Sequence, residues 1–213
     1  MTMPDLSREM ALGLLPALMG GRIVCGIDEV GRGPLAGPVV ACAVVIDPAR
    51  LDPDLASRID DSKKLPPKTR QVLHDELCAS VTYGLGQASV AEIDKVNILQ
   101  ATFLAMRRAV AKLPIKPHIA LIDGNRPPKL SCQTECLIGG DALSLSIAAA
   151  SIIAKVVRDK MMWELAQRHT VYGWETNVGY GTAEHLAAIT QHGVTKHHRR
   201  SFRPISQSLS ITD

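Results

Sequence analysis

The most constraining feature of this sequence is a strand-like run that ends in two adjacent acids. Residues 23–27 are apolar and rich in β-branched side chains, as in a core strand, and Asp28 and Glu29 follow directly. A carboxylate buried without a partner is costly, so something must compensate it, and a divalent cation is the obvious candidate. The bend Gly31–Gly33 comes next, where a backbone without side chains can approach a ligand closely.

Two plainer interpretations of this stretch stay open at this point. Adjacent acids at a strand end most often form a solvated turn. The glycines are also similar to a dinucleotide-binding fingerprint. However, Pro34 lacks an N–H, and a strand-like run follows where that fingerprint needs a helix. The bend therefore favours a different ligand.

Composition limits the classes of protein and partner. The chain has 213 residues, 46% hydrophobic and 21% charged, which suits one large domain or a domain with a small appendage. Its formal net charge of +3 is compatible with a partner that carries phosphate. Only 3% of the residues are aromatic, which argues against a platform that stacks many bases. A nucleic-acid partner would therefore be a duplex held by its backbone.

Cysteines and apolar runs indicate the compartment. Five cysteines, an odd number, predict free thiols in a reducing cytoplasm. Cys132 and Cys136 have the spacing of metal ligands, but no second Cys or His pair completes a zinc site. No apolar run reaches the roughly 18 residues that span a bilayer, so no membrane partner is expected.

Hydrophobic periodicity predicts an α/β chain. The expected strands are 23–30, 39–46, 81–90, 118–122 and 135–138, the first two pairing antiparallel. The expected helices are 5–20, 68–79, 91–113, 143–161 and 182–192, with a loop over 47–67. One apolar stripe should run along the helix over 91–113: Val96, Leu99, Phe103, Met106, Val110 and Leu113.

Three segments share one design, an apolar strand that delivers acid at its end. The acids are Asp28 with Glu29, Asp123 and Asp141, although Asp141 also suits the N-cap of the next helix. Sites assemble at such strand ends in α/β sheets, and carboxylates that meet there repel one another unless cations bind between them. Oxygen ligands without His or Cys favour Mg²⁺ or Mn²⁺, and two such ions about 4 Å apart suit phosphodiester cleavage.

Strand geometry sets a condition on this site. Neighbouring side chains of a regular strand point to opposite faces. Asp28 and Glu29 therefore share one metal pair only if the strand twists, bulges or ends there, which Gly31 and Gly33 would permit. In a regular strand, Glu29 would act through its backbone carbonyl or through a water molecule.

Seven motifs, in order, resemble the signature of the prokaryotic ribonuclease HII family over about residues 23–205. They are GIDEVGRGPLAGP (26–38), DSKKL (61–65), LIDGN (121–125), GD (140–141), AASIIAKV (149–156), GYGT (179–182) and HHRRSF (197–202). The resemblance implies a ribonuclease H-like α/β fold, a mixed five-stranded sheet flanked by helices with a small helical C-terminal appendage. It divides the chain into an N-terminal helical lead-in (1–22), a catalytic domain (23–170) and a helical, basic C-terminal segment (171–213) that completes the substrate groove.

The activity implied by this resemblance is that of a metal-dependent endoribonuclease. Such an enzyme cleaves the RNA strand of RNA–DNA hybrids and nicks duplex DNA 5′ of single embedded ribonucleotides. It leaves 5′-phosphate and 3′-hydroxyl ends by two-metal-ion hydrolysis with Mg²⁺ or Mn²⁺. We expect a monomer whose partners are the RNA–DNA hybrid and ribonucleotide-containing duplex DNA.

The resemblance also implies roles for individual residues. The catalytic, metal-binding carboxylates would be Asp28, Glu29, Asp123 and Asp141. The backbone of Gly31, Arg32 and Gly33 would sense the 2′-hydroxyl, which distinguishes RNA from DNA, and Tyr180 would stack on the sugar that follows the ribonucleotide. The phosphate-contact candidates are Lys63, Lys64, Lys155, Arg199 and Arg200.

The sequence departs from the family pattern at three positions. Val178 stands where many members have a lysine, so one phosphate contact is in doubt. Ser146 and Ala148 stand where many have a glutamate and a serine, and no role is assigned to them.

Two other functions remain as alternatives. Another nuclease or strand-transfer enzyme on the same fold would cut an all-DNA duplex as readily as one that contains a ribonucleotide. A non-catalytic hybrid-binding module would bind tightly in chelator, although four acids without metal would repel phosphate.

Overall fold

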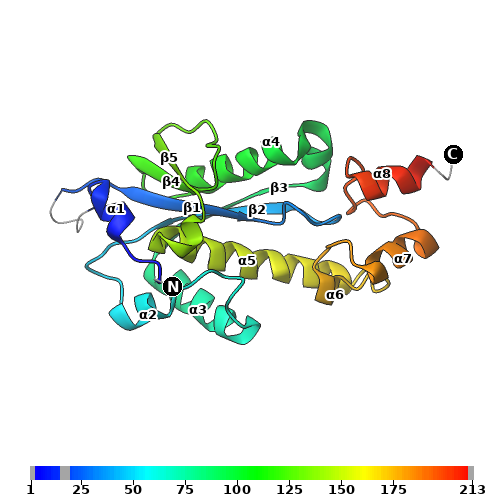
Figure 1. Cartoon of the computed structure of the whole chain (residues 1–213), viewed down its shortest axis with the longest axis horizontal. Helices are drawn as coiled ribbons and strands as arrows, with labels where there is room; N and C mark the ends of the chain where they lie inside the picture. The colour runs from blue at the N-terminus through cyan, green and yellow to red at the C-terminus, as the bar shows by residue number, and fades with distance from the viewer. Residues whose placement is uncertain (1–2, 15–19, 211–213) are drawn as a thin grey trace.

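A computed structural model describes the chain except for residues 1–2, 15–19 and 211–213. A five-stranded mixed sheet lies between layers of helices (Figure 1). In spatial order its strands are β3 (Thr82–Ala88), β2 (Val39–Val45), β1 (Val24–Val30), β4 (Ile119–Asp123) and β5 (Gln133–Leu137). β1 pairs antiparallel with β2 and parallel with β4. The predicted mixed sheet and its antiparallel first pair are thereby confirmed.

Helices cover both faces of this sheet. α4 (Val90–Ala111) lies on one face, and α5 (Leu145–Ala166) with α3 (Pro67–Ser80) lies on the other (Figure 1). Ile27 and Ala41 point into the core under α4, whereas Val40 and Cys42 point into the core under α5. Since both faces of β2 are buried, its uninterrupted apolar sequence is the one expected for a central strand.

The remaining helices are short. They are α1 (Ser7–Ala11), α2 (Pro53–Arg58), the 3₁₀ helix η2 (Gly140–Ala142), α6 (Trp174–Asn177), α7 (Ala183–His192) and α8 (Arg203–Ser210). The last three gather beyond the end of α5 (Figure 1), and apolar residues of this C-terminal part pack with Leu35, Ala36 and Met162. All five cysteines are free, as predicted. Within the described ranges, no helix is long and apolar enough to cross a membrane.

Two predictions near the N-terminal half are wrong. The helix expected over 5–20 ends at Ala11, because Gly13 turns the chain with a φ of 91° and Leu14 then bridges to Arg22; residues 15–19 lie outside the described part. The loop expected over 47–67 contains α2, whose first turn is set by the N-cap Asp52 and by Pro53.

The predicted apolar stripe on α4 is confirmed toward its C-terminal end, where Met106 and Leu113 are buried in the core, and is wrong at Val96. The helix is kinked at Asn97, which has φ 68° and ψ 166°, and Val96 is 36% exposed. The face packed on the sheet also carries small buried residues: Ala101, Ala105 and Ala109. Ala105 and Ala109 face Gly84 and Gly86 of β3, where glycine permits a close approach of helix and strand. A Cβ atom at Gly86 would lie 2.1 Å from the Ala105 carbonyl oxygen.

Replacing Gly86 with Ala should therefore lower the free energy of unfolding by about 1–3 kcal/mol, because helix α4 must move away from β3. The exposed neighbour Gln87 offers a matched control, and Gln87→Ala should change stability by less than about 0.5 kcal/mol. Urea denaturation of both variants measures the difference. Equal stability of the two variants would show that the packing of α4 on β3 is looser than described.

Candidate active site

The central strands β1 and β4 bring two of the predicted carboxylates together. Ile27 lies opposite Ile122 in this parallel pair, so Asp28 and Asp123 follow at adjacent positions on the same edge of the sheet. Asp28 is 5% exposed, and its Oδ1 accepts a hydrogen bond from the Glu29 N–H at 2.7 Å. The Asp123 Oδ1 accepts one from the Gly140 N–H, also at 2.7 Å. That bond ties β4 to η2, the element that carries Asp141.

Lys63 stands among the acids at the solvent side of the site. Its Nζ lies 3.8 Å from the Asp141 Oδ2, and its side chain is 79% exposed. Burial lowers the pKa of Lys63, but the carboxylates around it raise that pKa by more. They are Asp61, Asp141, Asp28 and Asp123. The structure thus places this predicted phosphate candidate beside the carboxylate group.

Glu29 faces away from Asp28. Strand pairing stays regular through Val30, and Glu29 lies opposite Ala41, whose side chain points under α4. The Glu29 Oε1 instead accepts a hydrogen bond from the Arg32 Nη1 at 3.1 Å. Glu29 and Arg32 line a pocket of about 280 Å³ on the α4 side, and Asp123 lines it too. The strand distortion that would aim both acids in one direction is therefore absent at Glu29.

Burial and mutual repulsion disturb the charges of this site. Burial, then Glu29 and Asp123, hold the pKa of Asp28 well above its usual range. Burial also raises the pKa of Glu29, with Asp123 adding to the effect and Arg32 opposing it. Burial, Asp61 and Asp123 raise the pKa of Asp141. Asp123 is thus the acid that interacts with the other three.

The carboxylates are held by protein groups. Across the described ranges, no three His, Cys, Asp or Glu side chains are grouped closely enough to enclose a metal ion. Each predicted carboxylate has a local partner instead: a backbone N–H for Asp28 and Asp123, Arg32 for Glu29 and Lys63 for Asp141. The donor chemistry nevertheless fits a hard cation, since carboxylate oxygens crowded at one strand edge are stabilised by positive charge, and burial raises the pKa values of Asp28, Glu29 and Asp141.

Two serines that the sequence analysis did not single out connect Asp28 to the loop that carries Lys63. Ser151 of α5 hydrogen-bonds to Asp28, and its hydroxyl lies 2.8 Å from that of Ser62. Both serines are buried. The Arg70 Nε then donates to the Ser62 carbonyl at 2.7 Å. Polar side chains within the apolar run of the AASIIAKV motif were the signal in the sequence for this chain of contacts.

Two fully buried arginines hold the glycine-rich bend from behind. The Arg199 guanidinium donates to the carbonyl oxygens of Gly31, Arg32 and Gly37. The Arg158 guanidinium donates to those of Ala36, Pro38 and Val178. Burial lowers the pKa of Arg199 to about 9 and that of Arg158 to about 10. Arg199, predicted to contact phosphate, is thus placed in the interior with its donors on backbone oxygens.

The other basic candidates are spread around the site. Lys64 pairs with Asp60 at 3.0 Å, and Lys155 pairs with Asp159 at 2.8 Å, apart from the four carboxylates. Arg200 is exposed, while its backbone N–H is held by Asp94. Of the five, only Lys63 forms an ion pair with one of the four predicted carboxylates among the described residues.

Tyr180 lies beside the glycine-rich bend. Its side chain is 47% exposed, and a Cβ atom at Gly33 would lie 3.3 Å from the Tyr180 Cε1. The two segments are joined where the Leu35 N–H donates to the Gly179 carbonyl at 2.7 Å. Val178, the position where a lysine was expected, has a φ of 44°. That conformation is strained for a β-branched residue, and the Arg158 bond to its carbonyl helps to hold it.

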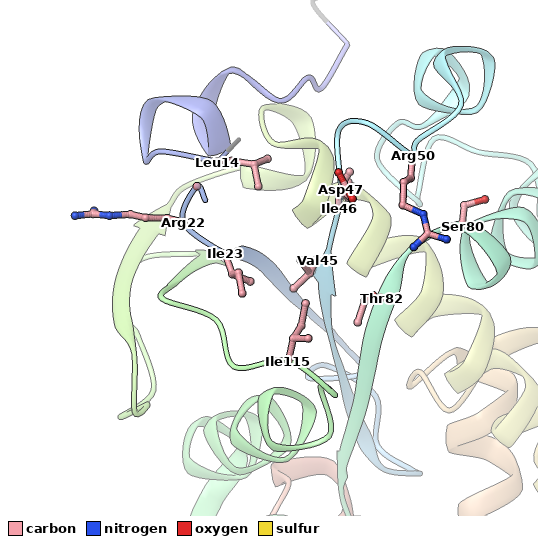
Figure 2. Close-up of a pocket in the computed structure, with 11 residues that line it drawn as sticks. Leu14, Arg22, Ile23, Val45, Ile46, Asp47, Arg50, Ser80, Thr82 and Ile115 are labelled. Carbon is pink, nitrogen blue, oxygen red and sulfur yellow. The ribbon is translucent and has the colours of Figure 1, made fainter. Parts of the chain in front are cut away.

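A second cavity of about 310 Å³ lies at the opposite end of the sheet (Figure 2). Ile23, Val45 and Thr82 line it, with Arg22 and Arg50 at its edge. None of the residues predicted for the site contributes to it. The carboxylate edge of the sheet is therefore the better candidate for an active site.

Comparison with known proteins shows the family of the chain. The sequence profile of the family described as Ribonuclease HII matches residues 25–205. The chain belongs to the ribonuclease HII family. It is 60% identical over 210 residues to the ribonuclease HII of Rhodospirillum rubrum, covering 98% of this chain and 93% of that protein. It is 58% identical over 207 residues to that of Paramagnetospirillum magneticum, covering 97% and 99%. Ribonucleases HII are metal-dependent hydrolases, ribonucleases H of type 2.

Solved structures share the fold. The ribonuclease H2 of Pyrococcus horikoshii OT3 aligns with a TM-score of 0.74 at 28% identity, covering 88% of this chain and 97% of that one. Bst-RNase HIII in complex with Mn²⁺ aligns with a TM-score of 0.74 at 20% identity, covering 96% of this chain and 72% of that one. The predicted ribonuclease H-like fold is confirmed, while the division into segments at residues 22 and 170 stays a prediction.

Replacing Asp123 with Asn should stabilise the protein in chelator by about 1 kcal/mol at neutral pH, because it removes the charge that repels the other three acids. The Asn Oδ1 can still accept from Gly140. The pKa values of Asp28 and Glu29 are raised on folding, so their contribution to stability is present at low pH and is lost as the pH rises through those values.

The gain from Asp123→Asn should therefore be largest above about pH 6 and should vanish near about pH 3, where Asp28, Glu29 and Asp141 are mostly protonated in both the folded and unfolded states. Urea denaturation at both pH values measures it. The exposed Glu164 on α5 provides the control, and Glu164→Gln should give no such gain. A gain of the same size at both pH values would contradict the proposed repulsion.

Proposed function

We propose that this ribonuclease HII cleaves the RNA strand of RNA–DNA hybrids and nicks duplex DNA 5′ of a single embedded ribonucleotide, leaving 5′-phosphate and 3′-hydroxyl ends. The observation that carries the proposal is the fixed orientation of the glycine-rich bend beside the carboxylates. The same bend lies against Tyr180, an exposed ring at its edge. The bend that would bind the ribonucleotide and the acids that would bind the metal ions are thus close together.

The geometry of the peptide bond fixes the direction in which the N–H groups of the bend point. In a trans peptide, the N–H points opposite to the preceding C=O, and the described chain has no cis peptide bonds. Since Arg199 binds the carbonyls of Gly31 and Arg32, the N–H groups of Arg32 and Gly33 point away from that guanidinium. Two N–H donors on an exposed bend suit a sugar hydroxyl, and a 2′-hydroxyl is what distinguishes RNA from DNA at one nucleotide.

Asp28, Asp123 and Asp141 would hold the cations with their carboxylates, and Glu29, in its regular strand, would act through its backbone carbonyl or a water molecule. We propose two Mg²⁺ or Mn²⁺ ions when substrate is present. When bound, such ions activate a water molecule and stabilise the charge on the leaving oxygen. Positive charge there would also offset the burial and repulsion that raise the pKa values of Asp28, Glu29 and Asp141. Mn²⁺ occurs in the related Bst-RNase HIII structure.

The surrounding side chains would orient the nucleic acid. Lys63, exposed beside Asp141, can bind a phosphate next to the one that is cut. Arg32 and Arg200 are exposed, whereas Tyr180 offers its ring to a sugar. We assign Arg199 to holding the bend and Lys64 and Lys155 to ion pairs of the fold. The groove would thus bind a duplex through backbone contacts.

The direct test uses duplex DNA with one ribonucleotide, an all-DNA duplex of the same sequence and an RNA–DNA hybrid, each with Mg²⁺, Mn²⁺ or chelator. A nick mapped to the 5′ side of the ribonucleotide, with metal only, is the expected result. Asp123→Asn should lower kcat by more than about 100-fold, since residues that only support a metal ligand already cost about 10–100-fold.

Glu164→Gln is the control for this loss and should cleave like the unmodified chain. Equal cutting of the all-DNA duplex would favour another nuclease on the same fold. Tight binding of the hybrid in chelator without cleavage in metal would favour a binding module. Retained turnover by Asp123→Asn would count against the assigned carboxylates.

A second test separates the two arginines of the C-terminal motif. Arg199→Lys should lower kcat/KM on the ribonucleotide-containing duplex by about 10-fold or more, because an ammonium group cannot bind three carbonyls in the fork geometry of a guanidinium. The exposed Arg200→Lys keeps the charge and should stay within about 2-fold. Comparable losses in both variants would indicate that Arg199 acts through its charge on phosphate.

A further inference from the structure

The Tyr180 segment is fixed by a buried ring that the activity described so far does not use. Gly179 and Gly181 flank Tyr180, so its sequence alone leaves the backbone free to adopt many conformations. In the structure the Tyr180 N–H donates to the Asn177 carbonyl at 2.9 Å. The Tyr180 carbonyl lies 2.8 Å from the His185 Nδ1, and His185 is fully buried.

The tautomer of His185 follows from its neighbours. The Thr195 N–H donates to the His198 Nδ1 at 2.9 Å, so a neutral His198 carries its proton on Nε2. That Nε2 lies 3.2 Å from the His185 Nε2 and must donate to it. The Trp174 Nε1–H, which can only donate, also points at the His185 Nε2, at 3.0 Å.

Two donors therefore meet at one nitrogen of His185, which leaves its proton on the other nitrogen. The Nδ1–H then has one acceptor, the Tyr180 carbonyl. Burial lowers the pKa of His185, and burial with His185 lowers that of His198 to about 4, in agreement with two neutral rings. Tyr172 stacks on Trp174 with ring centroids 5.0 Å apart and so fixes the indole.

We propose that His185 is a positioning residue for Tyr180: its Nδ1–H, fixed by Trp174 and His198, sets the backbone of Tyr180 and thereby the place of the ring against the sugar of the substrate. This inference rests on the proposed role of Tyr180. The ring of His185 does not touch the acids and takes no part in the chemical step. Through its bond to the Tyr180 carbonyl, His185 ties the exposed Tyr180 side chain beside Gly33 to the C-terminal core.

A pair of amide variants separates the two nitrogens of His185. The Asn amide nitrogen is the same number of bonds from Cβ as Nδ1, so His185→Asn can still donate to the Tyr180 carbonyl. The Gln amide is placed like Nε2, so His185→Gln can still accept from Trp174 but loses the bond to Tyr180. We expect His185→Gln to lower kcat/KM by about 10-fold, mainly through KM, and His185→Asn by less than about 3-fold, although both lose stability.

A double-mutant cycle with Tyr180→Ala distinguishes positioning from a general role in the core. If His185 acts through Tyr180, His185→Gln should cost less than about 2-fold in the Tyr180→Ala background. An undiminished 10-fold loss in that background, or equal losses for the Asn and Gln variants, would overturn the proposal.

Two further arms keep the result independent of the variants and of the proposed nicking. The cycle is run on both the RNA–DNA hybrid and the ribonucleotide-containing duplex, so a chain that cuts only the hybrid refutes nicking but still tests His185. Nitrogen-15 NMR of the unmodified chain reports which imidazole nitrogen carries the proton. A protonated Nδ1 that exchanges slowly is expected, and a proton on Nε2 of His185 would overturn the proposal even if no variant folds.

Discussion

The site depends on a separation of buried charge across the glycine-rich bend. On one side, burial raises the pKa values of Asp28, Glu29 and Asp141. On the other side, burial lowers the pKa values of Arg158 and Arg199, and the charge of Arg158 lowers that of Arg199 further. Ion pairs between the two groups would relieve both. The guanidinium groups bind backbone oxygens of the bend instead, which leaves the carboxylates available to cations.

This separation explains why the bend is built as it is. A Cβ atom at Gly31 would lie 2.1 Å from the Arg158 Nε, and one at Gly37 would lie 2.3 Å from the Met162 sulfur. Both glycines also have positive φ angles. Glycine is therefore required for the close approach of the arginines as well as for the turn itself. The same contacts that fix the carbonyls inward direct the N–H groups of Arg32 and Gly33 outward, so the exposed donors of the bend follow from the packing beneath it.

The positions of the acids could be predicted from the sequence because apolar strands with acidic ends are local patterns. Asp28, Asp123 and Asp141 meet at one sheet edge, as the strand order requires. The directions of the Glu29 and Arg199 side chains could not be predicted from the sequence, for physical reasons. Whether a strand stays regular past Asp28 depends on pairing with β2, which is not a local property. A basic run such as 196–201 is usually solvated, and only the fold shows that Arg199 is covered by the bend it supports.

Packing also decided where periodicity failed. Met106 of the predicted stripe on α4 is buried in the core, but the glycines of β3 bring the helix so close that Ala105 and Ala109 share that face, whereas Val96 is exposed. The kink at Asn97 then changes which side chains share a face.

Asn97 and Val178 are the two non-glycine residues with positive φ among those described, and such strain persists only where surrounding contacts impose it. At Val178 those contacts are the Arg158 bond and the packing of the C-terminal core. The strain therefore lies two residues from Tyr180, in a segment held by Arg158 at the Val178 carbonyl and by His185 at the Tyr180 carbonyl. These contacts keep the backbone strained at Val178, which lowers stability, and at the same time fix the place of the exposed Tyr180 ring.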